Sequence, residues 1–302
     1  MSDSYKVEFI VGSGEGDRYL RTYLKSTKKL SIKALRRLKI HDAVFVNGKT
    51  ALLKSIIQEG DRVVLEYPPE KVSPYIVAED IPINVVYEDE DIMVLDKQAG
   101  LCVHPNRRYP RGTLANGVLF YWGKSQKKIN PHFVNRLDKD TSGLILVAKS
   151  RYGAQQFFEQ QRERNISRSY QALVKGEIYP EMDTIDLPIG RADEDTTKRK
   201  VSPSGQVSIT NYKTLEKLSG YSLLDVQLDT GRTHQIRVHL SHLGFPILGD
   251  YLYGGESTLL KRQFLHAYKL KFYHPVQEKM IEFTSELPDD LLAVLAEIRR
   301  QD

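Results

Sequence analysis

The chain has 302 residues, 40% of them hydrophobic and 27% charged, a composition typical of soluble globular proteins that are long enough for two domain cores. Its one cysteine, Cys102, excludes a disulfide framework and a cysteine-based zinc site. The first residues lack the basic and then apolar order of a signal peptide, and no apolar run is long enough to span a membrane. We therefore expect a cytoplasmic protein without membrane spans.

Positive charge is concentrated near the N-terminus. Between Arg18 and Lys54 there are eleven lysines and arginines and one acid, Asp42, although the net charge of the whole chain is only +5. Such a basic module favours a polyanionic partner, and nucleic acid is the first candidate. The alternative is a basic face that is simply hydrated.

Two short helices are predicted in this basic segment. The first covers residues 17–24 with Asp17 as its N-cap, and the second follows Ser31 over residues 32–39. Strands at 43–46 and 61–66 come next, and the glycine-rich residues 12–16 are expected to be a flexible lead-in. The second helix is amphipathic, and the basic residues that lie mainly outside its apolar stripe are Lys33, Arg36, Arg37 and Lys39.

A domain boundary is predicted after the basic segment. Residues 67–74 contain three prolines, which is typical of a linker. Two strands at 83–87 and 92–95 then form a hairpin that opens a second domain. The sequence therefore predicts an N-terminal domain at 1–66, a linker at 67–79 and a larger domain at 80–302.

A polar segment near the middle of the chain directly precedes a short apolar run. Residues 135–143 are rich in Asp, Thr, Ser and Gly, and residues 144–148 are apolar, which predicts a buried strand entered from a turn. Asp138 thus lies at a loop-to-strand junction, with Arg136 on the same side of an extended segment. A nearby arginine favours an ionised carboxylate, as a nucleophile requires. On the residues alone, the more common interpretation is that Asp138 and Asp140 hold a turn.

The C-terminal half predicts further helices and strands. A helix at 151–164 is capped by Ser150, a strand at 166–176 carries Tyr170, and another strand covers 223–228. From periodicity alone, Tyr170 is a half-buried core residue. Residues 179–208 are expected to form a long hairpin or insertion with mobile tips, in which 198–200 are a solvated turn or, less favoured, an RNA contact. A final helix is predicted at 289–300.

A helix starting near Thr233 and ending at Gly244 carries several polar residues. The Gly231-Arg232-Thr233 start offers backbone N–H groups for a phosphate, and Arg237, one turn later, can reach a carboxylate. Three histidines, His234, His239 and His242, suggest zinc, but no cysteine or carboxylate completes a ligand set at suitable spacing. We therefore expect no metal.

Four segments of the chain resemble the RluA-type pseudouridine synthases. Arg136-Leu137-Asp138-x-x-Thr141-Ser142-Gly143-Leu144 closely resembles the active-site motif of that family. Lys97 to Pro105, Tyr170 to Gly176 and Gly231 to Gly254 resemble its other motifs, with Gln98 in place of the usual proline and Asn135 in place of the usual histidine. Residues 15–66 resemble an S4 RNA-binding domain.

This resemblance implies an α+β pseudouridine synthase fold with a mixed, mostly antiparallel sheet, preceded by a small S4-like domain. It implies that Asp138 is the nucleophile, that Tyr170 stacks on the target base and acts as general base, and that Arg237 pairs with Asp138. It also implies that Arg136 fills the space left by the flipped uridine. Isomerisation of uridine exchanges no electrons and adds no atoms, so we expect no cofactor.

The resemblance also bears on the substrate and the partners. The layout is closest to that of enzymes acting on large-subunit rRNA, so rRNA is the expected substrate and tRNA the second candidate. We expect a monomer. The alternatives are a non-catalytic RNA-binding or ribosome-assembly factor and a nucleoside hydrolase, although the basic domain argues against the hydrolase.

Overall fold

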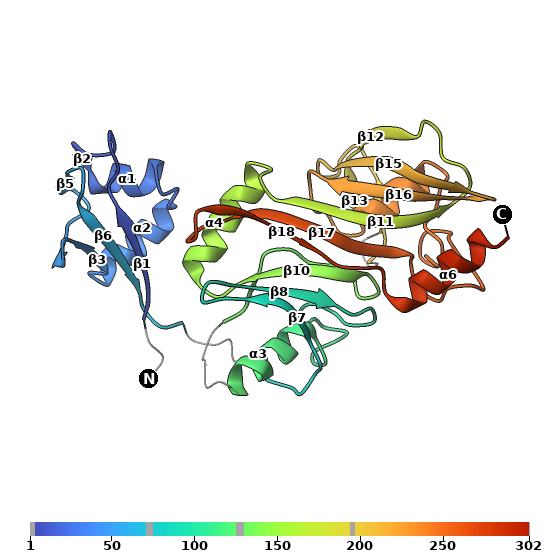
Figure 1. Cartoon of the computed structure of the whole chain (residues 1–302), viewed down its shortest axis with the longest axis horizontal. Coiled ribbons are helices and arrows are strands. Elements are labelled where there is room, and N and C mark those ends of the chain that lie inside the picture. Colours follow the sequence, from blue (N-terminus) through green and yellow to red (C-terminus); the bar gives the residue numbers. More distant parts are fainter. Residues whose placement is uncertain (1–3, 71–74, 125–129, 194–196, 302) are drawn as a thin grey trace.

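The computed structural model describes residues 4–70, 75–124, 130–193 and 197–301. Two units with separate sheets are joined along helix α4 (Figure 1). We call residues 4–67 the N-terminal unit and residues 75–301 the C-terminal unit. Among the helices in these described ranges, none combines the length and hydropathy that a bilayer crossing requires.

The N-terminal unit has a four-stranded sheet in the order β1-β6-β3-β4, with two helices beside it (Figure 1). Its elements are β1 Tyr5–Ile10, β2 Arg18–Tyr19, α1 Leu20–Ser26, α2 Ile32–Ile40, β3 Val44–Val46, β4 Lys49–Thr50, β5 Ile56–Ile57 and β6 Arg62–Tyr67. Ser31 caps α2 as predicted, because its hydroxyl accepts a hydrogen bond from the Ala34 N–H.

Two predictions for the N-terminal unit differ from the structure. Asp17 does not cap α1. It has a left-handed backbone (φ 53°) and its N–H donates to Ile57 O, so the chain pairs with β5 before the helix begins at Leu20. The strand β1 was not predicted, although Val7 and Phe9 are buried in alternation with exposed neighbours.

The C-terminal unit is built on a ten-stranded sheet in the order β12-β15-β16-β11-β17-β10-β8-β7, with β18 beside β17 and β9 beside β10. Among the strand pairs of this sheet that the described residues form, the β10–β17 pair alone is parallel, which confirms the mixed, mostly antiparallel α+β prediction. The strands of this sheet are β7 Asn84–Glu88, β8 Ile92–Lys97, β9 His132–Phe133, β10 Ser142–Ala148, β11 Ser167–Lys175, β12 Met182–Asp186, β15 Ile209–Leu218, β16 Tyr221–Leu228, β17 Leu265–His274 and β18 Lys279–Thr284.

In the described residues, four helices and one small hairpin accompany this sheet, and α3, α4 and α6 are labelled in Figure 1. They are α3 Leu114–Lys124, α4 Arg151–Arg162, α5 Gln235–His242, α6 Asp289–Arg299 and the hairpin of β13 Ile189–Arg191 with β14 Arg199–Val201. Ser150 caps α4 as predicted, by accepting the Gly153 N–H. Residues from α3 and α6 contribute to the largest apolar cluster, whereas Phe157 of α4 belongs to another.

Strand β10 carries the chain from the Asp138 loop into the core. All its residues are buried, and alternate side chains belong to the two apolar clusters, as expected for a strand covered on both faces. At its start, Gly143 has φ +113°, and a Cβ there would lie 2.3 Å from Ala267 O on β17. Glycine is therefore required for the parallel contact that places the loop.

The segment 179–208 is more ordered than predicted over its described residues. Strand β12 pairs with β15 at the sheet edge, and Ile189 of the β13–β14 hairpin packs with Val238 of α5 and with Tyr253. Arg199 belongs to β14, and its N–H donates to the Tyr253 hydroxyl at 2.9 Å. The prediction of a turn at 198–200 was therefore wrong, because residues 199–200 belong to a strand, although Lys198 and Lys200 are exposed as expected.

Helix α4 connects the two units. Tyr152, at its start, is only 3% exposed and lies in the apolar cluster of the N-terminal unit, with its ring 6.0 Å from that of Phe9 and 6.2 Å from that of Tyr67. Side chains of Gln155 and Gln156 donate to backbone oxygens of the N-terminal unit. The C-terminal unit thus supplies part of the core of the N-terminal unit.

Loss of the Tyr152 ring is expected to destabilise this junction. Tyr152→Ala removes a buried aromatic side chain and should lower the free energy of unfolding by about 3 kcal/mol. Urea titration followed by circular dichroism measures this. Phe158 on the same helix is 63% exposed, so Phe158→Ala is the matched control and should change stability by less than about 0.5 kcal/mol. Equal effects of the two substitutions would contradict this view of the junction.

Candidate active site

A cavity of about 780 Å³ opens beside the loop that enters β10. Its lining includes residues from that loop, from β11, from the segment leading into α5 and from the end of α4. It brings together five of the predicted site residues, namely Asp138, Tyr170, Arg237, Arg136 and Arg232. The other four, Lys33, Arg36, Arg37 and Lys39, lie on α2 in the N-terminal unit.

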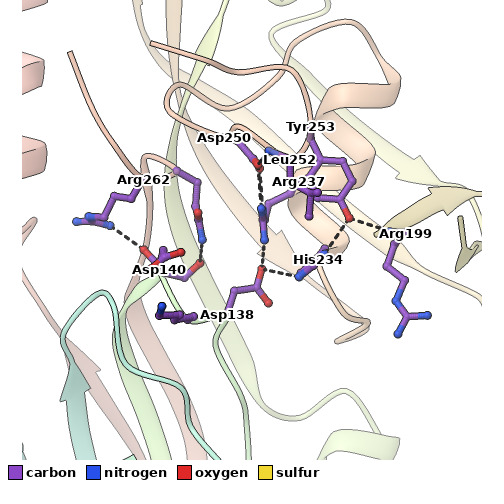
Figure 2. Close-up of polar contacts among 12 residues, drawn as sticks. Asp138, Asp140, Arg199, His234, Arg237, Asp250, Leu252, Tyr253 and Arg262 are labelled. Atoms are coloured by element: carbon purple, nitrogen blue, oxygen red, sulfur yellow. Dashed lines mark hydrogen bonds and ion pairs between the residues drawn. The ribbon is translucent and has the colours of Figure 1, made fainter. Parts of the chain in front are cut away.

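A chain of three charged side chains lies at the edge of this cavity (Figure 2). Arg237 donates from Nη1 to Asp138 Oδ2 at 2.9 Å, and from Nε and Nη2 to the two oxygens of Asp250 at 2.7 and 2.8 Å. The Asp250 side chain is fully buried, whereas that of Asp138 is 23% exposed. Burial opposes the charge of Arg237, but the two carboxylates raise its pKa. The accessible carboxylate is therefore Asp138.

The backbone around Asp138 is held by side chains from other elements. Lys97, at the end of β8, is fully buried and donates to the carbonyl oxygens of Gln98, Leu101 and Lys139, each at 2.9 Å. Burial lowers the pKa of Lys97 to about 8. Arg262 donates to Asp140 O at 3.1 Å. These bonds fix the loop before any ligand arrives, as a reactive group requires.

Lys97 and Asp250 were not predicted as site residues. Lys97 begins the first of the segments that resemble the family, and this was the available signal. Asp250 lies 13 positions after its partner Arg237, a separation at which no local periodicity links them.

Tyr170 lines the cavity from β11 and is only 5% exposed. Burial raises the pKa of its phenol, and the nearby Arg168 only partly offsets this. The hydroxyl is therefore neutral near pH 7. This environment suits a ring that packs on a base better than a phenolate that removes a proton.

The start of α5 differs from the prediction. The helix begins at Gln235 after His234, which has a left-handed backbone, so Thr233 is not its N-cap. The Arg232 N–H donates to the Gln235 side chain at 3.0 Å and is not free for a phosphate. Arg232 keeps an exposed side chain at the cavity.

Asn135 and Gln98, the two departures from the family motifs, have structural contacts. The amide of Asn135 donates to Leu144 O and accepts from the Leu146 N–H, so it ties the loop to β10. Gln98 donates to Pro82 O. Both side chains thus bond to the backbone of their own unit.

The three histidines considered for zinc have different environments. His239 is buried and bonds to Thr210 Oγ1 and Leu187 O, His242 is exposed, and His234 lies beside Asp138. Within the described ranges, a different group has metal-like geometry: ligand atoms of Asp89, Asp91 and His274 lie within 4.8 Å of one another. Hydrogen bonds from Tyr5, Tyr87 and Gln277 already engage these carboxylates. The hydrogen bonds at the junction of the two units therefore explain why these three side chains lie together, without a metal ion.

Comparisons with known proteins agree with this geometry. The family model described as RNA pseudouridylate synthase matches residues 91–242. The chain is 38% identical to an RNA pseudouridine synthase of Bacillus subtilis, YjbO, over 82% of this chain and 87% of that protein. It is 39% identical to ribosomal large subunit pseudouridine synthase D of Pseudomonas aeruginosa, over 84% and 83% of the two chains.

A solved structure gives the same result at the level of the fold. Human RNA pseudouridylate synthase domain containing 4 superposes with a TM-score of 0.59 at 26% identity, covering 72% of this chain and 93% of that chain. The sequence matches extend over most of both proteins and include the segment that carries Asp138 and Arg237. The chain therefore belongs to the RluA-type family of RNA pseudouridine synthases, which are isomerases.

Proposed function

We propose that this protein isomerises uridines of large-subunit ribosomal RNA, with Asp138 as the nucleophile. The observation that carries the proposal is the position of the Asp138 carboxylate at the cavity. It is held there by the buried Arg237, whose charge is already neutralised by Asp250. The relative from Pseudomonas aeruginosa is named as an enzyme of the large ribosomal subunit, which favours large-subunit rRNA as the substrate. Transfer RNA is the second candidate substrate.

The reaction breaks the bond from N1 of uracil to C1′ of the ribose and forms a bond from C5 to C1′, while the C5 proton is lost and N1 gains one. A glycosidic bond is broken, so a carboxylate suits the task, as in retaining glycosidases. Asp138 serves either by adding to C1′ or by removing the C2′ proton. Arg237 orients the carboxylate and Tyr170 packs on the uracil ring.

The basic groups around the cavity suit RNA. Arg136 and Arg232 are exposed on its lining, where they can meet phosphates or fill the place of a uridine flipped out of its stack. Flipping costs a few kcal/mol, so contacts of this kind must compensate.

We further propose that the N-terminal unit is an S4-like RNA-binding domain, with α2 as its contact surface. Among the described residues, Lys33, Arg36, Arg37 and Lys39 make no ion pair, unlike Lys6 and Arg62 of the same unit. Arg36 and Lys39 line a groove of about 1190 Å³. Cations without acidic partners are available to neutralise phosphates.

The first test is a pseudouridine map of rRNA and tRNA from cells that lack the gene and are complemented with variants. Wild type should restore particular sites and Asp138→Asn should restore none, since the amide is not a nucleophile. Asp140→Asn is the matched control, because Arg262 holds the backbone oxygen of Asp140 and not its carboxylate. If Asp138→Asn restores the sites, the protein acts without this carboxylate, and a non-catalytic role in RNA binding or ribosome assembly takes its place.

Asp250 is expected to support the reaction through Arg237. Asp250→Asn removes one of the two carboxylates that balance the buried positive charge of Arg237, and should lower the free energy of unfolding by about 3 kcal/mol. The single-turnover rate should fall at least about tenfold, because Arg237 is free to turn away from Asp138. Thermal melting and rapid-quench assays measure the two effects. As the control, Glu216→Gln breaks an exposed ion pair with Arg299 and should lower the free energy of unfolding by less than about 1 kcal/mol. An equally small effect of Asp250→Asn would argue against a supporting role of Asp250 at Arg237.

The α2 surface can be tested by salt dependence. Replacing Lys33, Arg36, Arg37 and Lys39 together by alanine should weaken RNA binding and lower the slope of log K against log salt by up to about 3. A control with the same charge change replaces Lys217, Lys269, Lys271 and Arg299, which pair with glutamates of the C-terminal unit. Filter binding at several salt concentrations distinguishes them. Equal slopes for the two variants would remove α2 from the RNA contact surface.

A further inference from the structure

A second set of contacts reaches the Asp138 carboxylate, through His234 and Tyr253. His234 Nε2 lies 3.8 Å from Asp138 Oδ2, and His234 Nδ1 lies 2.8 Å from the hydroxyl of Tyr253 (Figure 2). The two rings meet edge to face, with centroids 5.7 Å apart and planes at 79°. Tyr253 is 7% exposed, so its side chain is largely shielded from solvent.

The hydrogen bonds of Tyr253 favour one tautomer of His234. The Tyr253 oxygen accepts the Arg199 N–H at 2.9 Å, which leaves its own proton to donate. Burial raises the pKa of Tyr253 to about 12, so that proton is present. We assign that proton to the hydrogen bond with His234 Nδ1, which then acts as the acceptor. In this assignment the neutral ring carries its proton on Nε2, the nitrogen that faces Asp138.

The backbone of His234 is in the left-handed region, which few residues other than glycine adopt. It has φ 58° and ψ 20° at the N-cap of α5, a left-handed conformation that asparagine tolerates better than most residues. Residues in such conformations cluster at functional sites, although this chain has others outside the cavity, such as Lys29 and Glu278. From this position His234 lines the cavity.

We propose that His234 is a positioning residue whose Nε2–H, aligned by Tyr253, holds Asp138 as a second arm beside Arg237 and does so only while the imidazole is neutral. The proposal rests on the proposed role of Asp138 as nucleophile. The 3.8 Å separation exceeds a hydrogen bond, and such contacts tighten when a substrate closes the site.

Protonation of His234 would disable this arm. In the imidazolium both ring nitrogens carry protons, so Nδ1 can no longer accept the Tyr253 proton. The ring also becomes a second cation beside the Asp138 carboxylate, which Arg237 already contacts. A carboxylate with two cationic partners is a weaker nucleophile. Burial is the largest influence on the pKa of His234 and lowers it. The charged and titratable groups that face the ring are Asp138, Arg237, Asp250, Arg199 and Tyr253, with Lys198 over the Tyr253 ring.

Two substitutions separate this role from a structural one. In His234→Gln the side-chain amide can present an N–H near the position of Nε2 but does not titrate. In His234→Asn the left-handed backbone is better tolerated, but the side chain is too short to reach Asp138. A purely structural role predicts that Asn is at least as active as Gln. The proposal predicts the reverse order.

The experiment measures single-turnover rates of the full-length protein on an RNA substrate identified by the pseudouridine map, between pH 5 and pH 8.5. As the pH falls below the lowered pKa of His234, the wild-type rate should decrease by about tenfold per pH unit. The rate of His234→Gln should not show this decrease. At pH 8, His234→Asn should be about tenfold slower than His234→Gln, the equivalent of one hydrogen bond, with unchanged RNA affinity.

Several outcomes would overturn the proposal. These are a rate for His234→Asn equal to or above that of His234→Gln, the same acid fall in His234→Gln as in wild type, or a loss of RNA affinity that accounts for the slower rate. If the Gln variant does not fold, Tyr253→Phe decides. It keeps the ring but not the proton donor and should slow the reaction about fivefold, whereas an unchanged rate overturns the proposal. Activity of Asp138→Asn would instead reject the proposed nucleophile, which is a separate result.

Discussion

The site depends on a buried arginine placed between two carboxylates of different exposure. Removing the Arg237 guanidinium from water is costly, and the bidentate contact with Asp250 offsets that cost within the core. The Arg237–Asp250 pair is neutral as a unit, so the charge of Asp138 is left over and is the one that faces the cavity. A single pair with Asp138 alone would instead tie the nucleophile into a closed salt bridge. The second carboxylate thus allows Arg237 to orient Asp138 without cancelling its charge.

The loop of Asp138 is rigid for reasons that lie outside the loop. Lys97 from β8 bonds to the carbonyl of Lys139, and Arg262 from the segment before β17 bonds to that of Asp140. Both strands pair with β10, directly after the loop. Gly143 lets β10 approach β17 closely enough for this arrangement. Three neighbouring strands therefore place one carboxylate, which explains how a loop residue is held as firmly as a core residue.

The sequence predicted the parts of the structure that local patterns control. Ser31 and Ser150 cap their helices, and the apolar run after Asp138 forms a buried strand, because capping and periodicity act over a few residues. Asp17 and Thr233 failed as caps because pairing with β5 and the strained His234 override local preference. The contribution of Arg199 was missed because it depends on folding the 179–208 segment back onto Tyr253, a contact between distant residues. The position of Asp138 and the pairing with Arg237 were predicted through motifs, whereas Asp250 needed the fold.

Helix α4 links the parts of the molecule that the proposed reaction uses. Tyr152 at its start completes the core of the N-terminal unit, Phe157 in its middle packs on the sheet beneath β10, and Gln161 near its end lines the cavity. One helix therefore spans both units and the site (Figure 1). If α2 holds RNA as proposed, the distance from that contact to Asp138 is set by a packed helix and not by the linker. An RNA that engages both surfaces must then present its uridine at that distance, so the choice among uridines becomes a matter of RNA shape and need not depend on reading the neighbouring bases.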